Sequence, residues 1–276
     1  MSVLRLSRVS KFAIVAVVAT GSILAGLSRP LTAPLPTTTA MAEMTWVEVR
    51  TAIQHGHDTV LVPSGGFEQS GPHMILDKHQ HIVGLTSRLI AEAHGRMLVA
   101  PVISLVPQGG YAPTSGNMVF PGTIGVTEEV FAGMLDGVAR SLRSAGFKRI
   151  VFMADHGQSQ KPQAEVAARL SREWAGSGIS VMALGEYYSK GDEAQRALLM
   201  ARGETAASIG DHAGLQDTAE LMFAHGAGVK TDRLGTLTLE ADGASGQPAR
   251  ASAELGKLLI DLKVKAALAQ LAAPNS

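Results

Sequence analysis

Residues 60–79 read VLVPSGGFEQSGPHMILDKH. The first letters form a short apolar run, which is typical of a buried strand, and a pair of glycines follows it. Glu68, His73, Asp77 and His79 come next, so side chains that can bind metals or carry protons gather where the chain leaves the strand. Because α/β proteins build their sites on loops at strand ends, this stretch indicates both a fold class and the position of a site.

Two later segments have the same character. Residues 154–158 read ADHGQ and follow a second apolar run, and residues 212–218 read HAGLQDT. Taken with the first stretch, they predict a metal-dependent hydrolase whose site is assembled from separate loops.

Composition limits the alternatives. The chain has 276 residues, of which 46% are hydrophobic, so it can bury a sizeable core in one main domain. Its net charge is zero and it has no basic stripe, which argues against nucleic-acid binding. It contains no cysteine, so a metal site would need histidine and carboxylate ligands.

The N-terminus differs from the rest of the chain. Basic residues precede an apolar stretch over residues 12–27, and a Pro/Thr-rich segment then leads to Ala40-Met41-Ala42. This order predicts a signal peptide and leader over residues 1–42, and an exported domain, periplasmic or secreted, over residues 43–276. An uncleaved N-terminal anchor is the alternative and would be the chain's only contact with a membrane.

Strand-like apolar runs alternate with helical patterns along the domain. This alternation predicts an α/β fold, a three-layer αβα sandwich with a mostly parallel central sheet. The long glycine-rich loop over residues 107–125 has no apolar periodicity, and loops of that length are often functional. The predicted strands are 59–63, 97–106, 148–154 and 179–184, and the predicted helices are 45–56, 79–95, 127–146, 163–175, 217–225 and 253–271.

These segments resemble the creatininase family of metal-dependent amidohydrolases. The resemblance implies a creatininase-like fold, hydrolysis of a C–N bond in a small amide by metal-activated water, and assembly into a homo-oligomer. It extends over most of the chain after the leader, and the family's motifs occur in the family's order. They correspond to residues 68–79, 120–124, 154–159, 212–218 and 243–252.

The chain departs from the family pattern at several site positions. Ser70 stands where the family has a histidine, and His79 stands where it has an aspartate that bridges two metals. Asn117 replaces a further histidine, and Asp217 replaces a glutamate. A carboxylate can offer one oxygen to each of two cations, whereas a neutral imidazole donates through one nitrogen. The substitutions therefore argue against a two-metal centre.

The remaining ligand set is Glu68, His79 and His156. Two histidines and a glutamate form one of the ligand sets of catalytic zinc sites, which keep a position open for water. We therefore expect one divalent cation, zinc in the first place, although manganese or iron is chemically tolerable. Asp155 is expected to orient His156 from behind.

His212 and Asp217 are the predicted catalytic residues. The resemblance places His212 near the reaction, where it would transfer a proton to the leaving nitrogen, with Asp217 orienting it or acting as a fourth ligand. Structural roles stay open for each: a helix cap for His212 or His79, a helix N-terminal acid for Asp217, and packing within its loop for His73.

Two functions compete at this point. The first is an exported amidohydrolase acting on a small-molecule amide such as creatinine, a formamide, a lactam or a peptide-derived precursor. The second is a non-catalytic exported ligand-binding protein that kept the fold and lost the dinuclear metal site. We favour the enzyme because the changed positions still form a coherent ligand set, which random loss would rarely leave.

Overall fold

The computed structural model describes residues 33–235 and 237–273. Within them, a parallel sheet has the strand order β2-β1-β3-β4. The central strands β1 and β3 pair from Thr59 opposite Arg149 to Ser64 opposite Ala154, so the two segments that carry the first motifs end side by side. The strands are β1 (Thr59–Ser64), β2 (Met97–Val99), β3 (Arg149–Ala154) and β4 (Ser180–Ala183).

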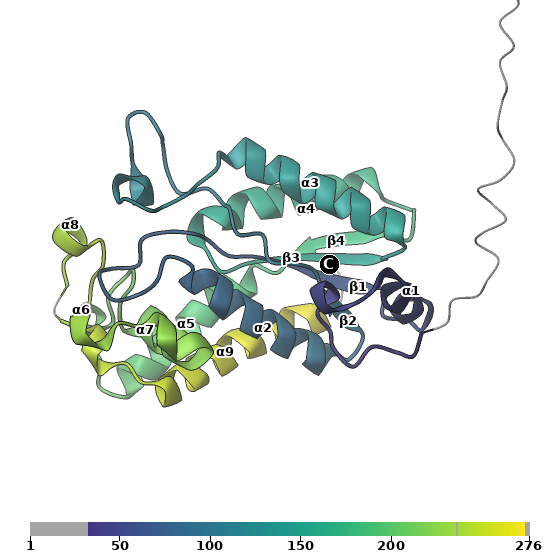
Figure 1. The fold of residues 1–276 in the computed structure, drawn as a ribbon. Helices are drawn as coiled ribbons and strands as arrows, with labels where there is room; N and C mark the ends of the chain where they lie inside the picture. Colours follow the sequence, from purple (N-terminus) through teal and green to yellow (C-terminus); the bar gives the residue numbers. More distant parts are fainter. Residues whose placement is uncertain (1–32, 236, 274–276) are drawn as a thin grey trace, which may run out of the picture. The chain divides into compact units, whose positions relative to one another are not determined.

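Helices cover both faces of this sheet (Figure 1). On one face α1 (Trp46–Gln54), α3 (Glu128–Ala145) and α4 (Gln160–Glu173) pack on inward side chains such as Val60 and Phe152. On the other face α2 (Lys78–His94), α5 (Glu186–Ala201) and α9 (Ala253–Ala272) pack on the alternate strand residues, such as Leu61 and Met153. The remaining helices are α6 (Ala206–Ile209), α7 (Leu215–His225) and α8 (Leu239–Asp242). The predicted three-layer αβα sandwich is confirmed.

The helix ends follow their sequence signals. Thr45 accepts the N–H of Glu48, and the Glu48 carboxylate accepts the N–H of Thr45, which is the capping box that a Thr and a Glu three residues apart form at the start of α1. The side chain of Thr127 accepts the N–H of Val130 and caps α3, which ends at Gly146 in a left-handed conformation.

The short helices α6 and α8 were not predicted, and two larger differences concern β2 and α5. The strand predicted over residues 97–106 ends at Val99, because Pro101 has no N–H to donate and only Ile103 makes a further bridge, to Ser64. Helix α5 was not predicted at all. Its buried stripe consists of Tyr187, Gly191, Gln195 and Leu199, and a stripe that is half glycine and glutamine gives little apolar periodicity.

The predicted signal peptide has its apolar core within residues 1–32, outside the described residues. Just after them, the carbonyl of Thr39 accepts the N–H of Val99 at 2.8 Å, and Met41 packs against the core. Residues 39–41 thus contact the domain at the edge of its sheet, while the predicted boundary at residue 42 stays a prediction. In the described ranges, no helix combines the length and apolarity that membrane crossing requires.

Candidate functional site

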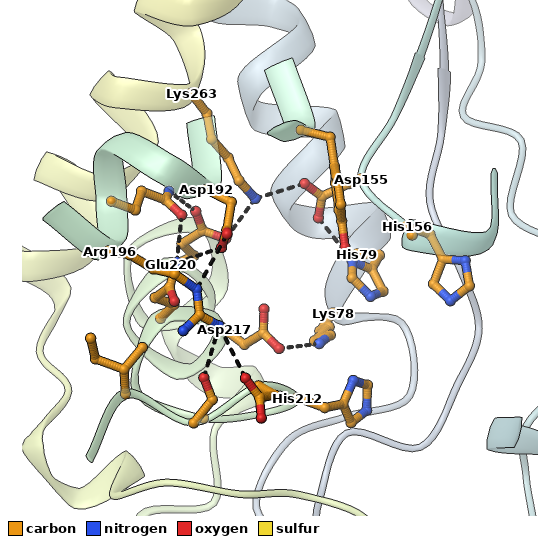
Figure 2. A pocket seen from close by; sticks show the side chains of 18 of the residues that line it. Lys78, His79, Asp155, His156, Asp192, Arg196, His212, Asp217, Glu220 and Lys263 are labelled. Carbon is orange, nitrogen blue, oxygen red and sulfur yellow. Dashed lines mark hydrogen bonds and ion pairs between the residues drawn. The ribbon is translucent and has the colours of Figure 1, made fainter. Parts of the chain in front are cut away.

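The predicted site residues come together beyond the carboxyl ends of β1 and β3. They line a pocket of about 260 Å³, which Figure 2 shows from close by. The sequence places them there because β1 and β3 are parallel neighbours, so their following loops meet at one edge of the sheet. The predicted residues are Glu68 in the loop after β1, His79 at the start of α2, Asp155 and His156 after β3, His212 before α7, and Asp217 in its first turn, and Lys78 lies in the lining beside them.

Glu68 is the centre of the site. Its side chain is buried, and its Oε1 accepts from Nε2 of His79 at 2.8 Å while its Oε2 accepts from Nε2 of His156 at 2.9 Å. Asn117, from the long loop over residues 107–125, donates its amide to the same Oε2. Burial opposes the negative charge, but the two imidazoles outweigh it and hold the pKa of Glu68 well below its ordinary value.

His79 is held between two carboxylates. Its Nδ1 donates to Oδ2 of Asp155 at 2.8 Å, and its Nε2 faces Glu68. Burial and the nearby Lys78 ammonium disfavour a charged imidazole, but the two carboxylates outweigh them and raise the pKa of His79. Asp155 was expected to orient His156, and that expectation is wrong: among the described residues, Nδ1 of His156 has no hydrogen-bond partner.

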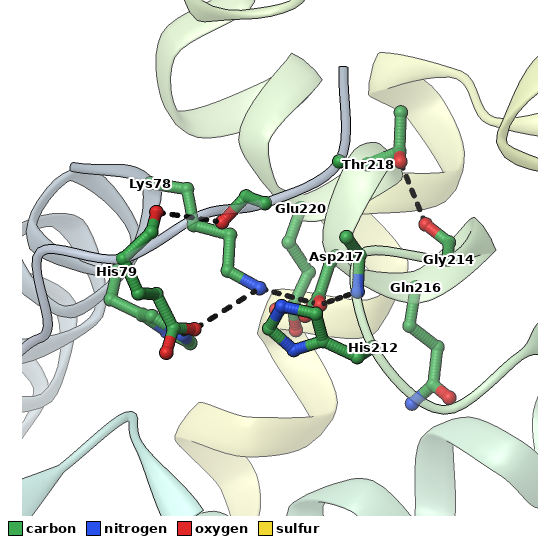
Figure 3. A network of polar contacts seen from close by, with 12 residues as sticks. Lys78, His79, His212, Gly214, Gln216, Asp217, Thr218 and Glu220 are labelled. Carbon is green, nitrogen blue, oxygen red and sulfur yellow. Dashed lines mark hydrogen bonds and ion pairs between the residues drawn. The ribbon is translucent and has the colours of Figure 1, made fainter. Parts of the chain in front are cut away.

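Lys78 was not singled out in the sequence. It is the first residue of α2 and is fully buried, with its Nζ 2.6 Å from Oδ2 of Asp217 and 4.0 Å from Oε1 of Glu68 (Figure 3). Burial opposes its charge, but the two carboxylates outweigh burial and raise the pKa of Lys78. The same oxygen of Asp217 also accepts the N–H of Ala213 at 2.8 Å. Asp217 is therefore committed to Lys78 and to the backbone.

His212 forms another part of the pocket wall. Its Nε2 donates to the carbonyl of Gln69 at 3.0 Å, which fixes the ring against the first motif. Burial, reinforced by the Lys78 ammonium, lowers the pKa of His212, so the imidazole is neutral at neutral pH. Helix α7 begins after Gly214 without a side-chain cap, so His212 does not serve as its cap.

His73 lies outside the pocket lining. Its Nε2 donates to the hydroxyl of Thr218 at 2.9 Å, and that hydroxyl donates to the carbonyl of Gly214 at 2.7 Å. Burial, aided by Lys78, lowers the pKa of His73 to about 4. His73 therefore ties the first motif to α7, in line with its alternative structural role.

A buried polar network lies behind Asp155 and holds it in place. Oδ1 of Asp155 accepts from the hydroxyl of Tyr187 at 2.7 Å and from Nζ of Lys263 at 2.8 Å. Lys263 also donates to Glu220 at 2.9 Å, so this network joins α5, α7 and α9 to the end of β3. The sequence did contain a signal for it, because Lys263 stands on the buried stripe of α9 between Leu259 and two later apolar positions.

A parallel α/β sandwich with a carboxylate and two imidazoles at the carboxyl edge of its sheet has the architecture of an α/β enzyme. The family model for creatinine amidohydrolase matches residues 42–271, and the chain belongs to the creatininase family.

Curated relatives align with part of the chain. A creatinine amidohydrolase of Pseudomonas putida is 29% identical over 119 residues, covering 42% of this chain and 44% of the relative. A mycofactocin precursor peptide peptidase of Mycobacterium ulcerans (strain Agy99) is 28% identical over 178 residues, covering 64% and 62%. The chain thus spans less than two thirds of the length of either relative.

Solved structures share the fold over a longer range. A mutant creatininase described as the Zn-Zn type superimposes with a TM-score of 0.71 at 23% identity, covering 86% of this chain and 98% of the other. At that identity the likeness supports the fold alone.

The donor set is suited to one divalent cation. Glu68, His79 and His156 offer a carboxylate and two imidazole nitrogens, and Asp155 anchors the far nitrogen of His79 as in many metal sites. Donor atoms on a tetrahedral zinc stand about 3.3 Å apart when each bond is about 2.0 Å. The donors here are 2.8 and 2.9 Å apart because they hydrogen-bond to one another. Accordingly, no group of three or more such side chains in the described ranges is already arranged around a metal position.

The same residues do not fit a pair of cations. Ser70 offers a buried hydroxyl whose contact is the Glu68 carbonyl at 3.5 Å, and His79 cannot bridge. Asp217, the remaining carboxylate near Glu68, is engaged by Lys78. The site is thus suited to one cation by its donor chemistry.

Proposed function

We propose that this protein is a metal-dependent amidohydrolase that cleaves a C–N bond of a small amide, cyclic amides included. The observation that carries the proposal is the pair of contacts from His79 and His156 to opposite oxygens of Glu68, in a chain of the creatininase family. Two imidazoles and a carboxylate form a ligand set of hydrolytic zinc sites. Zinc is therefore the proposed cation, and manganese or iron would be chemically tolerable.

Each residue has a defined part in this proposal. Glu68, His79 and His156 would hold the cation, which when bound would polarise the amide carbonyl and lower the pKa of a water molecule to about 7. Asp155 keeps a proton on Nδ1 of His79, so Nε2 would be the nitrogen that gives up its proton to bind the cation. His212, a neutral imidazole in the pocket wall, would accept a proton and return it to the departing nitrogen.

The proposal also covers the size of the substrate, the export of the protein and its assembly. The pocket of about 260 Å³ suits a small polar substrate rather than a folded protein. Export rests on the leader predicted over residues 1–42, and a homo-oligomer is the assembly that the family resemblance implies.

The test is hydrolysis by zinc-loaded protein of a panel that contains creatinine, a formamide, a lactam and a short peptide. Wild type should hydrolyse the C–N bond of at least one substrate, which releases an amine from a linear amide and opens the ring of a cyclic one. His212→Asn should retain zinc and lose about 10²- to 10⁴-fold in kcat, as expected for a lost proton carrier. Glu68→Gln should lose zinc and activity together. The matched control is Lys257→Met, at an exposed position of α9, which should leave the rate unchanged.

Two outcomes would count against the proposal. One is turnover that His212→Asn and Glu68→Gln leave unchanged, because the reaction would then occur elsewhere. The other is zinc binding without turnover of any substrate in the panel. That result would favour the non-catalytic ligand-binding protein.

A further inference from the structure

Lys78 places a positive charge inside the site. Its side chain is 1% exposed, and its ammonium lies between the carboxylates of Asp217 at 2.6 Å and Glu68 at 4.0 Å. Buried lysines are rare unless they are paired, because removing the ammonium from water is costly. The carboxylates of Asp217 and Glu68 are the partners of the ammonium. The Glu68 oxygen nearest to it, Oε1, is the one that also contacts His79.

The charge of Lys78 lies next in sequence to a proposed metal ligand, His79. Lys78 is the first residue of α2 and directly precedes His79, so one turn delivers both an imidazole and an ammonium to Glu68. A positive charge at a helix N-terminus is disfavoured by the helix dipole. Its burial there therefore depends on the carboxylates that face it.

A second cation would need Glu68, Asp217 and the residue at position 70 as its ligands. Asp217 gives its Oδ2 to Lys78 and to the N–H of Ala213. Ser70 is buried and presents a neutral hydroxyl where an imidazole donor would be needed. Any cation placed between Glu68 and Asp217 would meet the ammonium of Lys78 at close range, where the repulsion is strong.

We propose that the ammonium of Lys78 takes the place of a second divalent cation, so that the site holds one cation beside a fixed positive charge. This inference rests on the proposed metal-dependent function and specifies its charge balance. Glu68 then contacts both the cation and the ammonium. Its Oε2 faces His156, and its Oε1 faces His79 and Lys78. Lys78 is a positioning residue here, because it acts on the cation through Glu68 and Asp217.

The experiment is zinc titration of the full chain, with stoichiometry from elemental analysis and affinity from competition with a chelator. Wild type should bind one zinc per chain. Lys78→Met removes the repulsion and should bind zinc at least tenfold more tightly or take up a second zinc. Lys78→Arg keeps the charge and should behave as wild type. Lys257→Met removes an exposed charge from α9 and should also behave as wild type.

A second variant guards against misfolding of Lys78→Met, which leaves the half-buried carboxylate of Asp217 without its ammonium partner. Asp217→Asn alone should weaken zinc binding, because it leaves the ammonium facing Glu68. The double variant Lys78→Met/Asp217→Asn removes both charges and should recover wild-type affinity or better. If Asp217 were instead a ligand, the double variant would stay weak and the proposal would fail.

Other results would also overturn the proposal. Two zinc ions in wild type, no zinc in wild type, or equal affinity in wild type and Lys78→Met would each contradict it. None of these measurements depends on turnover. An absence of amide hydrolysis together with the expected zinc counts would reject the proposed function and leave the charge assignment standing.

Discussion

The Nδ1 atom of His79 lies 2.8 Å from Oδ2 of Asp155, and this bond joins the start of α2 to the end of β3. It keeps a proton on Nδ1, so Nε2 is the nitrogen that can give up its proton and bind a cation. We predict that Asp155→Asn lowers zinc affinity by about 10- to 100-fold, the usual effect of losing such an anchor. Chelator competition measures it. Asp58→Asn, at a half-buried carboxylate outside the site, is the control, and equal affinities for Asp155→Asn and wild type would refute the anchoring role.

Lys263 is predicted to be essential for stability. Its ammonium contacts Asp155 at 2.8 Å and Glu220 at 2.9 Å, and all three side chains are buried. Lys263→Met removes the ammonium that neutralises two buried carboxylates and should lower the free energy of unfolding by about 3–5 kcal/mol. Urea unfolding measures this change. Lys257→Met breaks an exposed pair with Asp261 on the same helix and should leave the midpoint nearly unchanged. Equal midpoints for the two variants would contradict the network.

Gly256 allows α9 to approach α7 closely. A Cβ at this position would lie 1.8 Å from the carbonyl oxygen of Ala219, so Gly256→Ala should force the helices apart. We expect a loss of about 1–3 kcal/mol in the free energy of unfolding. Gly133→Ala on α3 meets nothing within 4 Å and should stabilise the protein by about 0.5–1 kcal/mol, through helix propensity alone. Thermal unfolding of both variants measures the two changes in stability. If both variants changed stability in the same direction, the close approach of α9 to α7 would not explain the effect of Gly256→Ala.

His73 gives the stability a defined dependence on pH. Its pKa is about 4 in the folded protein, against 6.5 for an unperturbed histidine. Between these values the unfolded chain binds the proton and the folded chain does not, so the free energy of unfolding falls as the pH is lowered through this window.

The measurement is the urea midpoint at pH 7, 6 and 5, in the presence of a chelator so that metal release makes no contribution. His73→Gln, which can still donate to Thr218, should show a shallower fall than wild type. Identical slopes for the two proteins would mean that other groups cause the fall.

The sequence sufficed for the parts of the fold that depend on local signals. The buried runs of β1 and β3 and the caps at Thr45 and Thr127 follow from patterns within a few residues. Parallel neighbouring strands then bring the two motif loops together without further information.

The charged residues that were missed depend on distant partners. Lys78 bonds to Asp217, which lies 139 residues further along the chain, and Lys263 bonds to Asp155, 108 residues before it. A lysine beside a helix start is usually solvated, so local pattern gives no reason to bury Lys78. Asp155 was assigned to its sequence neighbour His156, but the turn after β3 directs it to His79.

The most direct test of the single-cation site is metal content per chain by elemental analysis of wild type, His79→Ala and His156→Ala, each dialysed after zinc loading. We predict one zinc in wild type and its loss in both variants, because each variant removes one of the nitrogens that face Glu68. Circular dichroism of the variants would show that the fold is retained. Two zinc ions in wild type, or one zinc retained after either substitution, would contradict the account.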